Sequence, residues 1–267
     1  MEQCSKNRAG KGRLQEKTAV AGWLVFFPAI CFVIWYGIFS ADAARAFSIP
    51  ERLVYDLTWT GVKAGTATLE VVNEGDSIRV ISTANSANWV SVFYTVEDRV
   101  EAVLAKGKSD IFMAQPKNYR LRIREGRHRR DKEIIFDYPR KKAVFIDHLD
   151  VDKKEFTIHE NVFDPLSVLY YVRTMKLEVG KPVFVDIFDS KKLWNVEVQV
   201  LRKERISSIM GDVDTLVVKP LMKSEGIFNR KGDMYIWLTD DQRRIPVRMQ
   251  TKVAVGSITA TLVSGTY

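Results

Sequence analysis

A two-residue alternation of side-chain character runs through residues 232–262 and constrains the fold more than any other feature of the chain. Successive side chains of a β-strand point to opposite faces, so this period predicts half-buried strands. Asp240 and Asp241 interrupt the pattern with residues that favour turns, because a short carboxylate can accept nearby backbone amides. Gly256 marks a second break. We therefore predict a β-meander whose three strands cover residues 234–238, 245–249 and 258–262.

Residues 1–46 have the composition of an export signal. A basic head is followed by the uncharged run 19–39 and then by two small-x-small sites that end at Ala43 and Ala46. The run exceeds the usual signal core of about 7 to 15 residues and reaches the roughly 20 that a spanning helix needs. Cleavage near Ala43 or Ala46 and retention as a membrane anchor both stay open. Either outcome predicts a periplasmic body, because the basic head stays in the cytoplasm.

Residues 47–267 are predicted to form a single β-rich envelope domain. Neither a flexible linker nor a repeat divides them, and all-β domains of this size are common. Both cysteines, Cys4 and Cys31, lie in the leader, so the body holds no thiol or disulfide. Further strands are predicted at 53–59, 67–72, 78–81, 96–104, 119–123, 133–138, 143–149, 155–159, 183–188, 193–201 and 215–218.

One principal helix is predicted at about residues 164–175. Asp164 is a good N-cap, and Pro165 suits the first helical position, where its missing N–H costs nothing. Apolar residues follow at helical spacing on more than one narrow stripe. The fold class is therefore mainly β: an antiparallel curved sheet or incomplete β-barrel with this helix packed on or in it.

Three stretches carry a resemblance to a known family: FDPLSVLYYVR (163–173), KPVFVDIFDSKKLWNVEVQV (181–200) and GDMYIWLTDDQRRIPVRMQTKVAVGSITATL (232–262). They resemble an uncharacterised family of exported bacterial proteins known as a domain of unknown function, over nearly all of the body. The resemblance implies a curved sheet or incomplete barrel around a hydrophobic interior, and it carries no catalytic or binding residues. A looser architectural likeness links the body to periplasmic lipoprotein carriers, whose half-barrel holds acyl chains.

The residues give no support to an enzyme. His148, with Asp147 and Asp150 beside it, lacks the close helical spacing of a catalytic zinc motif, so we predict no metal site. Asp240 and Asp241 are interpreted as turn residues, and no Gly-x-Ser-x-Gly elbow is present. We therefore predict no catalytic residue and no cofactor.

A basic hairpin is the sharpest charged feature of the body. If Glu125 and Gly126 form a two-residue turn, Arg124 lies opposite Arg127 and Arg122 opposite Arg129, and such like-charge pairs are destabilising. Acids such as Glu133, Asp137 or Glu155 could neutralise them, or an anion could. The alternative is a solvated outer face that discourages edge aggregation. The candidate contacts to anionic headgroups or envelope polymers are Arg120, Arg122, Arg124, Arg127, Arg129 and Arg130.

Aromatic side chains are the second group of candidates. They fit either the core of a β-domain or the lining of a pocket for an apolar ligand, and the sequence leaves both open. The candidate pocket residues are Trp59, Trp89, Tyr170, Tyr171 and Trp237.

These features together predict a non-enzymatic envelope protein that binds a lipophilic or anionic envelope component. A scaffold or assembly partner without a small ligand is the alternative, and a hydrolase of envelope polymers is the third. The chain is basic, with a net charge of +8 at pH 7, which would also suit nucleic acid, but export argues against such a partner. The expected partners are a lipid or anionic polymer, and the membrane itself if the leader is retained.

Overall fold

The computed structural model describes residues 48–106, 115–221, 233–253 and 255–267, all within one compact unit. The predicted export signal, its cleavage sites and the anchor at 19–39 lie outside the described residues. Within those residues, no helix combines the length and the apolar character that crossing a membrane requires.

The described residues form a 15-stranded sheet and two helices, α1 and α2. The strands are β1 Glu51–Trp59, β2 Val62–Glu74, β3 Ser77–Ser86, β4 Glu97–Ala105, β5 Pro116–Glu125, β6 His128–Asp137, β7 Lys142–Asp147, β8 Asp152–Thr157, β9 Val162–Phe163, β10 Val183–Asp189, β11 Lys192–Ser208, β12 Gly211–Leu221, β13 Met234–Thr239, β14 Pro246–Lys252 and β15 Ser257–Thr266. The helices are α1 Asn88–Ser91 and α2 Ser167–Thr174.

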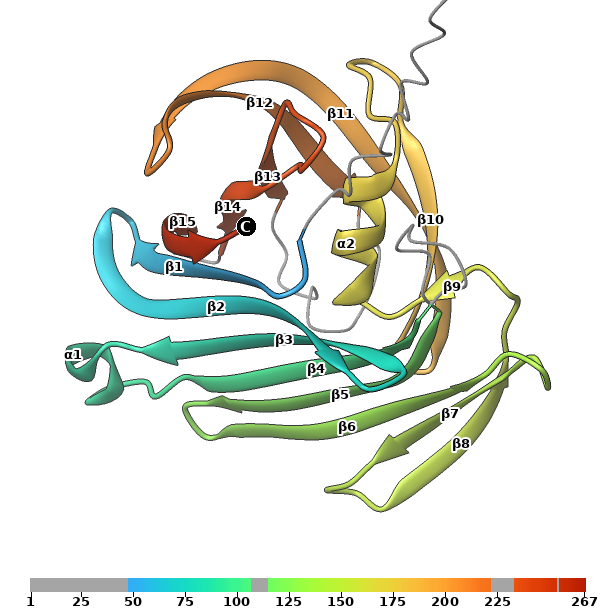
Figure 1. Ribbon diagram of the computed structural model, residues 1–267. Coiled ribbons are helices and arrows are strands. Elements are labelled where there is room, and N and C mark those ends of the chain that lie inside the picture. The colour runs from blue at the N-terminus through green and yellow to red at the C-terminus, as the bar shows by residue number, and fades with distance from the viewer. Residues whose placement is uncertain (1–47, 107–114, 222–232, 254) are drawn as a thin grey trace, which may run out of the picture. The chain divides into compact units, whose positions relative to one another are not determined.

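The sheet is curved, and α2 lies on its concave side (Figure 1). Its order runs from β8 back to β1, then from β15 back to β9, so that the first and last strands of the body pair at its centre. Neighbouring strands are antiparallel except for β9 beside β10. The predicted mainly β class, with a curved sheet or incomplete barrel around one principal helix, is confirmed.

The sheet does not close, because β8 and β9 are its two ends. Side chains cross this seam instead of backbone hydrogen bonds. The rings of Phe156 and Phe188 pack with centroids 5.4 Å apart, and Lys191 Nζ lies 2.6 Å from a carboxylate oxygen of Asp152. The unpaired edge is protected by the brevity of β9 and by the charged residues of β8, both of which oppose edge-to-edge association.

The C-terminal meander is confirmed as β13, β14 and β15. Ile236 pairs with Met249, and Met249 pairs with Ala260, so the predicted inward positions share one face. Pro246 is the first residue of β14 and lies at an irregularity of the register opposite Leu238, where a missing amide donor is tolerated. The period-two pattern therefore located both the strands and their buried face.

The helix predicted at 164–175 is present as α2 but begins at Ser167. Asp164 acts as a cap, but Pro165 and Leu166 form a turn before the first regular helical residue. The second helix, α1, is a single short turn between β3 and β4.

The predicted register of the basic hairpin is wrong. Glu125 pairs with His128, so the two-residue turn consists of Gly126 and Arg127. Gly126 takes a φ of 55°, which glycine adopts without strain at the first position of such a turn. As a result Arg124 opposes Arg129, while Arg122 opposes Asp131 and Arg120 opposes Glu133, which leaves one like-charge pair.

Candidate functional site

Helix α2 is fixed at its start by a buried carboxylate. Asp164 accepts the backbone amides of Leu166 at 2.8 Å and Ser167 at 2.9 Å, and also the hydroxyl of Ser167. Burial raises the pKa of Asp164 to about 6, although these three hydrogen bonds act to lower it. The carboxylate therefore satisfies helix donors that would otherwise be unpaired inside the domain.

A buried ion pair fixes the other end of α2. The Arg173 guanidinium donates two hydrogen bonds of 2.7 Å to the two carboxylate oxygens of Glu51 on β1, and both side chains are fully buried. Arg173 also donates to the backbone oxygen of Arg243, between β13 and β14, at 3.1 Å. Such a pair has little freedom, because separating the charges inside the domain would be costly. Helix α2 is thereby held against the centre of the sheet.

An apolar cavity of about 270 Å³ lies between α2 and the concave face of the sheet. Its lining comes from both halves of the sheet, with Leu69 and Val100 on one side and Val198 and Ile236 on the other. The complete lining is Leu69, Ser82, Val100, Pro165, Leu166, Val168, Leu169, Val172, Val185, Ile187, Val196, Val198, Val218, Pro220, Met234, Ile236, Leu238 and Met249. Ser82 carries the one polar side chain in that set.

This lining defines what the cavity can hold. A void of about 150 Å³ lined by aliphatic side chains stays dry and takes up benzene, and known ligand pockets begin near 300 Å³. The present cavity lies between these sizes and offers one hydroxyl for polar contact. It is suited to a flexible hydrocarbon segment, and a polar or charged group would lose its hydration there without replacement.

The predicted aromatic residues do not line this cavity. Tyr170 is fully buried, with the Arg173 guanidinium lying over its ring one turn further along α2. The Tyr171 ring stacks on Phe163 with centroids 4.2 Å apart. Trp237 alternates with the cavity residues of β13 and therefore faces the opposite side of the sheet. Trp59 is the last residue of β1 and Trp89 lies in α1, and their side chains are 43% and 47% exposed.

The aliphatic lining was missed because the sequence shows orientation but not free volume. The alternation in β13 predicts correctly that Ile236 and Leu238 share one face, and in the structure Val196 and Val198 of β11 also point into the cavity. Whether inward side chains meet or leave a void depends on how far α2 stands from the sheet. That distance follows from the buried Asp164 cap and the pairing of Arg173 across more than one hundred residues.

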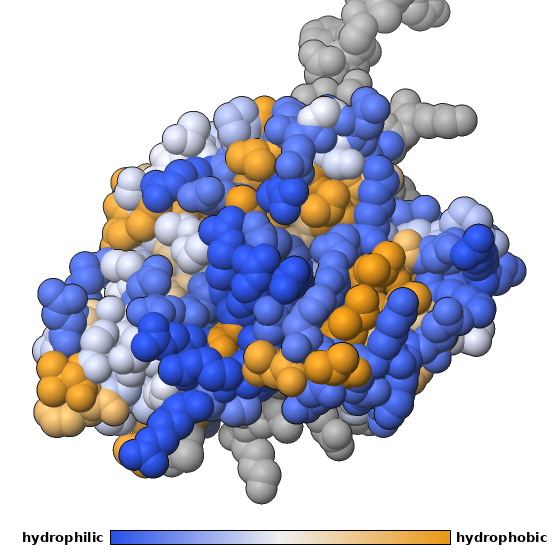
Figure 2. Space-filling view, turned by 90° about the horizontal axis from the view of Figure 1, so that it is seen from below, coloured by the Kyte–Doolittle hydropathy of each residue, from blue (hydrophilic) through white to orange (hydrophobic). Residues whose placement is uncertain are grey.

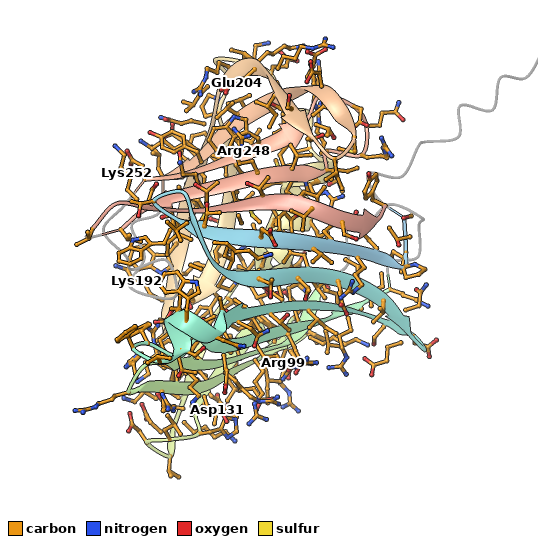
Figure 3. All side chains as sticks on the ribbon, turned by 90° about the vertical axis from the view of Figure 1, so that its left-hand side faces the viewer. Arg99, Asp131, Lys192, Glu204, Arg248 and Lys252 are labelled. Atoms are coloured by element: carbon orange, nitrogen blue, oxygen red, sulfur yellow. The ribbon has the colours of Figure 1, made fainter. Side chains whose placement is uncertain are left out.

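The six candidate arginines are split between two faces and a turn. Arg120 donates two hydrogen bonds of 3.0 Å to Asp131, Arg124 pairs with Glu97 at 2.6 Å, and Arg122 lies 3.8 Å from Glu101. Figure 3 labels Asp131 on β6 and Arg99 on β4, the strands on either side of β5, and Arg99 pairs with Glu101.

Asp131, Glu97 and Glu101 therefore pair with the arginines of the convex face. Of the acids that the sequence offered for this role, Glu133 lies opposite Arg120, whereas Asp137 and Glu155 pair with Arg140 and Lys142. The hydrogen bond from Arg120 lowers the pKa of Asp131, as expected for a carboxylate held by a guanidinium.

The other three arginines lie apart from this network. Arg129 donates to the backbone oxygens of Gly126 and His128, and the exposed Arg127 occupies the turn itself. Arg130 lies on the opposite face of β6 from Arg129 and contacts His128 at 2.6 Å. The structure does not bring the six residues together at one place.

The other titratable residues that the sequence singled out lie in ion pairs and turns. His148 contacts Glu133 at 2.8 Å, and His159 lies 3.3 Å from Asp186. Asp240 pairs with Lys203, whereas Asp241 accepts the amides of Arg243 and Arg244. Within the described ranges, no three histidine, cysteine, aspartate or glutamate side chains converge in a way that could hold a metal ion.

Fold and interior together define a mainly β, barrel-like domain that encloses one helix and an apolar cavity. The chain belongs to the family described as "Protein of unknown function (DUF3108)", whose sequence profile matches residues 54–263. No curated protein matches it.

Among solved structures, it is similar to a crystal structure described as a beta-barrel-like protein of domain of unknown function DUF1849 from Brucella abortus. The sequence identity is 12% and the TM-score is 0.51, and the match covers 81% of this chain and 96% of the other. This likeness concerns the fold alone.

Proposed function

We propose that this protein is a non-enzymatic component of the bacterial cell envelope that binds the hydrocarbon part of a lipid between helix α2 and the curved sheet. The observation that carries the proposal is the cavity of about 270 Å³, lined almost entirely by aliphatic side chains from both halves of the sheet. An interior without a ligand would gain by collapsing, since every unfilled volume costs stability. Here α2 is anchored at both ends, which prevents that collapse.

The energy available for binding follows from the chemistry of the lining. Each methylene group that moves from water into such an interior contributes about 0.8 kcal/mol, or about fourfold in affinity. Specificity for the polar end of the ligand would have to come from groups outside the cavity, because Ser82 alone could contact it inside. The proposal therefore concerns the ligand's acyl or isoprenoid chain and leaves the headgroup open.

The envelope location rests on the sequence of the leader. A basic head, an apolar run and two cleavage sites precede a body that contains no cysteine, and lipids to be carried or sensed are abundant on the far side of the inner membrane. The body uses ion pairs, and not disulfides, to fix its helix in place.

Two substitutions on one strand test the cavity. Val198 and Val200 lie on the same face of β11, are both buried, and differ in that Val198 lines the cavity while Val200 does not. Phenylalanine at position 198 can enter the void, so Val198→Phe should leave the free energy of unfolding unchanged or raise it by about 0.5 to 2 kcal/mol. Val200→Phe must displace packed neighbours and should cost about 1 to 3 kcal/mol.

Binding of saturated fatty acids of increasing chain length, measured by displacement of a fluorescent fatty acid, gives the functional readout. The wild type and Val200→Phe should gain affinity by about fourfold per methylene until the cavity is filled, and Val198→Phe should reach its limit at a shorter chain. If the affinity of the wild type does not depend on chain length, the proposal that the cavity binds a hydrocarbon chain is wrong. Such a result would favour the scaffold, which uses the surface of the sheet without a small ligand.

A further inference from the structure

Large apolar side chains are exposed together at one end of the sheet. We call this group of side chains the aromatic rim; it consists of Trp59, Val62, Trp89, Val92, Phe93, Tyr94 and Val255. Val92 is 75% and Phe93 is 85% exposed, which is unusual for side chains of this size. In the view from below, hydrophobic surface appears at the left-hand margin, where Figure 1 places α1, beside a mostly hydrophilic convex face (Figure 2).

Specific contacts tie these turns into one surface. Trp59 Nε1 donates to the backbone oxygen of Val255 at 2.9 Å, which links the β1–β2 turn to the β14–β15 turn. Trp89 Nε1 donates to the backbone oxygen of Lys63 at 2.9 Å, which links α1 to β2. The Tyr94 ring packs against Gly126, so closely that a Cβ at that glycine would lie 2.7 Å from it. The rim is therefore continuous from β14 to β6.

The hydrogen bonds of both indoles matter for what the rim can contact. Each indole N–H already has a backbone acceptor, so Trp59 and Trp89 could enter an apolar layer without leaving a polar donor unsatisfied. The same bonds restrict the rings before any contact forms, which lowers the entropic cost of binding. Val92 and Phe93 supply the most accessible hydrocarbon.

Basic residues border the rim on both sides. Arg127 is exposed in the β5–β6 turn, directly after the Gly126 that Tyr94 packs against, and Lys252 is exposed at the end of β14. Figure 3 shows Lys252 at the margin where β14 ends. An aromatic cluster flanked by cations matches the interface of a bilayer, where aromatic rings lie at headgroup depth and guanidinium or ammonium groups meet phosphate.

We propose that the aromatic rim docks on an anionic lipid bilayer. Register supports a link to the interior, because Met234 pairs with Thr251, Thr251 with Ile258, and Ile258 with Trp59, so that a cavity residue lies in the same cross-strand row as the rim. Delivery of lipid between bilayer and cavity rests on the proposed function. Docking itself does not rest on the proposed function, because a protein whose cavity is filled would dock in the same way.

The test reads the rim directly, so that the leader cannot imitate docking. In the full-length chain, Cys4 and Cys31 are replaced by serine, and one new thiol is introduced by Phe93→Cys and labelled with an environment-sensitive fluorophore. The matched control is Phe184→Cys, which removes the same residue type from an exposed site on β10 that is not part of the rim. Vesicles contain either phosphatidylglycerol with phosphatidylethanolamine or phosphatidylcholine alone, each with and without brominated acyl chains.

We expect the label at position 93 to shift to shorter wavelength and to be quenched by brominated chains in the anionic vesicles, while the label at position 184 does neither. Replacing Arg127 or Lys252 by glutamine should weaken this response by about fivefold each, which corresponds to about 1 kcal/mol per basic residue. Val198→Phe in the same background should dock normally. That result separates docking from cavity binding.

A label at position 93 that stays in water on anionic vesicles would overturn the proposal, as would equal quenching at positions 93 and 184. A response of equal size on phosphatidylcholine, unaffected by Arg127→Gln and Lys252→Gln, would also overturn the role of anionic headgroups.

Discussion

Removing the buried partner of Glu51 should destabilise the domain more than any exposed charge does. In Arg173→Met the Glu51 carboxylate remains fully buried without its two 2.7 Å hydrogen bonds, and the backbone oxygen of Arg243 loses its donor. Breaking a buried pair in this way costs about 3 to 5 kcal/mol. For a domain of this size each kcal/mol lowers Tm by about 2 to 4 °C, so we expect a fall of about 6 to 20 °C.

Arg52→Met is the matched control. It also replaces an arginine by methionine, and Arg52 directly follows Glu51 on β1. Arg52 also contacts a carboxylate on a neighbouring strand, Glu70 at 2.8 Å, but its side chain is 56% exposed. A solvated pair of this kind contributes about 1 kcal/mol or less. Urea unfolding followed by circular dichroism should therefore separate the two variants by at least about 2 kcal/mol.

The double variant Glu51→Met with Arg173→Met extends the test. Two apolar side chains of similar length remove both charges, so the double variant should be more stable than Arg173→Met alone. Equal stability of Arg173→Met and Arg52→Met would refute the reasoning, because Arg173 could then not hold α2 from a buried position. A double variant that is no more stable than Arg173→Met would show that poor packing of the buried methionines, and not the unpaired charge, causes the loss.

Two further predictions concern a buried acid and a turn. Because burial raises the pKa of Asp164 to about 6, the folded state binds its proton more tightly than the unfolded chain, and this stabilisation, present below pH 4, is lost as the pH rises through 6. Between pH 4 and pH 7 this effect should lower the free energy of unfolding, measured in urea, by about 2 to 3 kcal/mol. Asp164→Asn keeps an acceptor for Ser167 and should abolish that decline, and an unchanged decline would contradict the assignment. Gly126→Ala should cost more than Gly75→Ala, since both glycines have a φ of 55° but only a Cβ at position 126 would meet the Tyr94 ring. Thermal unfolding of the two variants should differ by about 1 kcal/mol or more, and equal losses would show that Tyr94 does not pack there.

The strands could be predicted from the sequence because a period of two is a local property. The meander of β13 to β15 required only the alternation of side chains. The mutual placement of distant elements could not be predicted in this way. The pairing of Arg173 with Glu51 joins residues that are 122 positions apart, and no spacing in the sequence indicates it.

The candidate site shows the same division between local and distant information. Asp164 was recognised as a helix cap, but its complete burial depends on what surrounds it. The basic hairpin was located, yet the position of Gly126 within the turn decides which arginine opposes which acid, and a shift of one residue in the turn moved every partner by two. The large aromatic residues are natural candidates for a pocket lining, whereas the cavity is formed by smaller aliphatic ones.

The most direct measurement is native mass spectrometry of the protein purified from its own envelope after export through its own leader, with parallel lipid extraction. We predict one co-purifying lipid per chain in the wild type and in Val200→Phe, and its loss in Val198→Phe. Wild-type protein that carries no lipid after purification, and takes up none from added vesicles, would contradict the central claim that the cavity beside α2 is a lipid site.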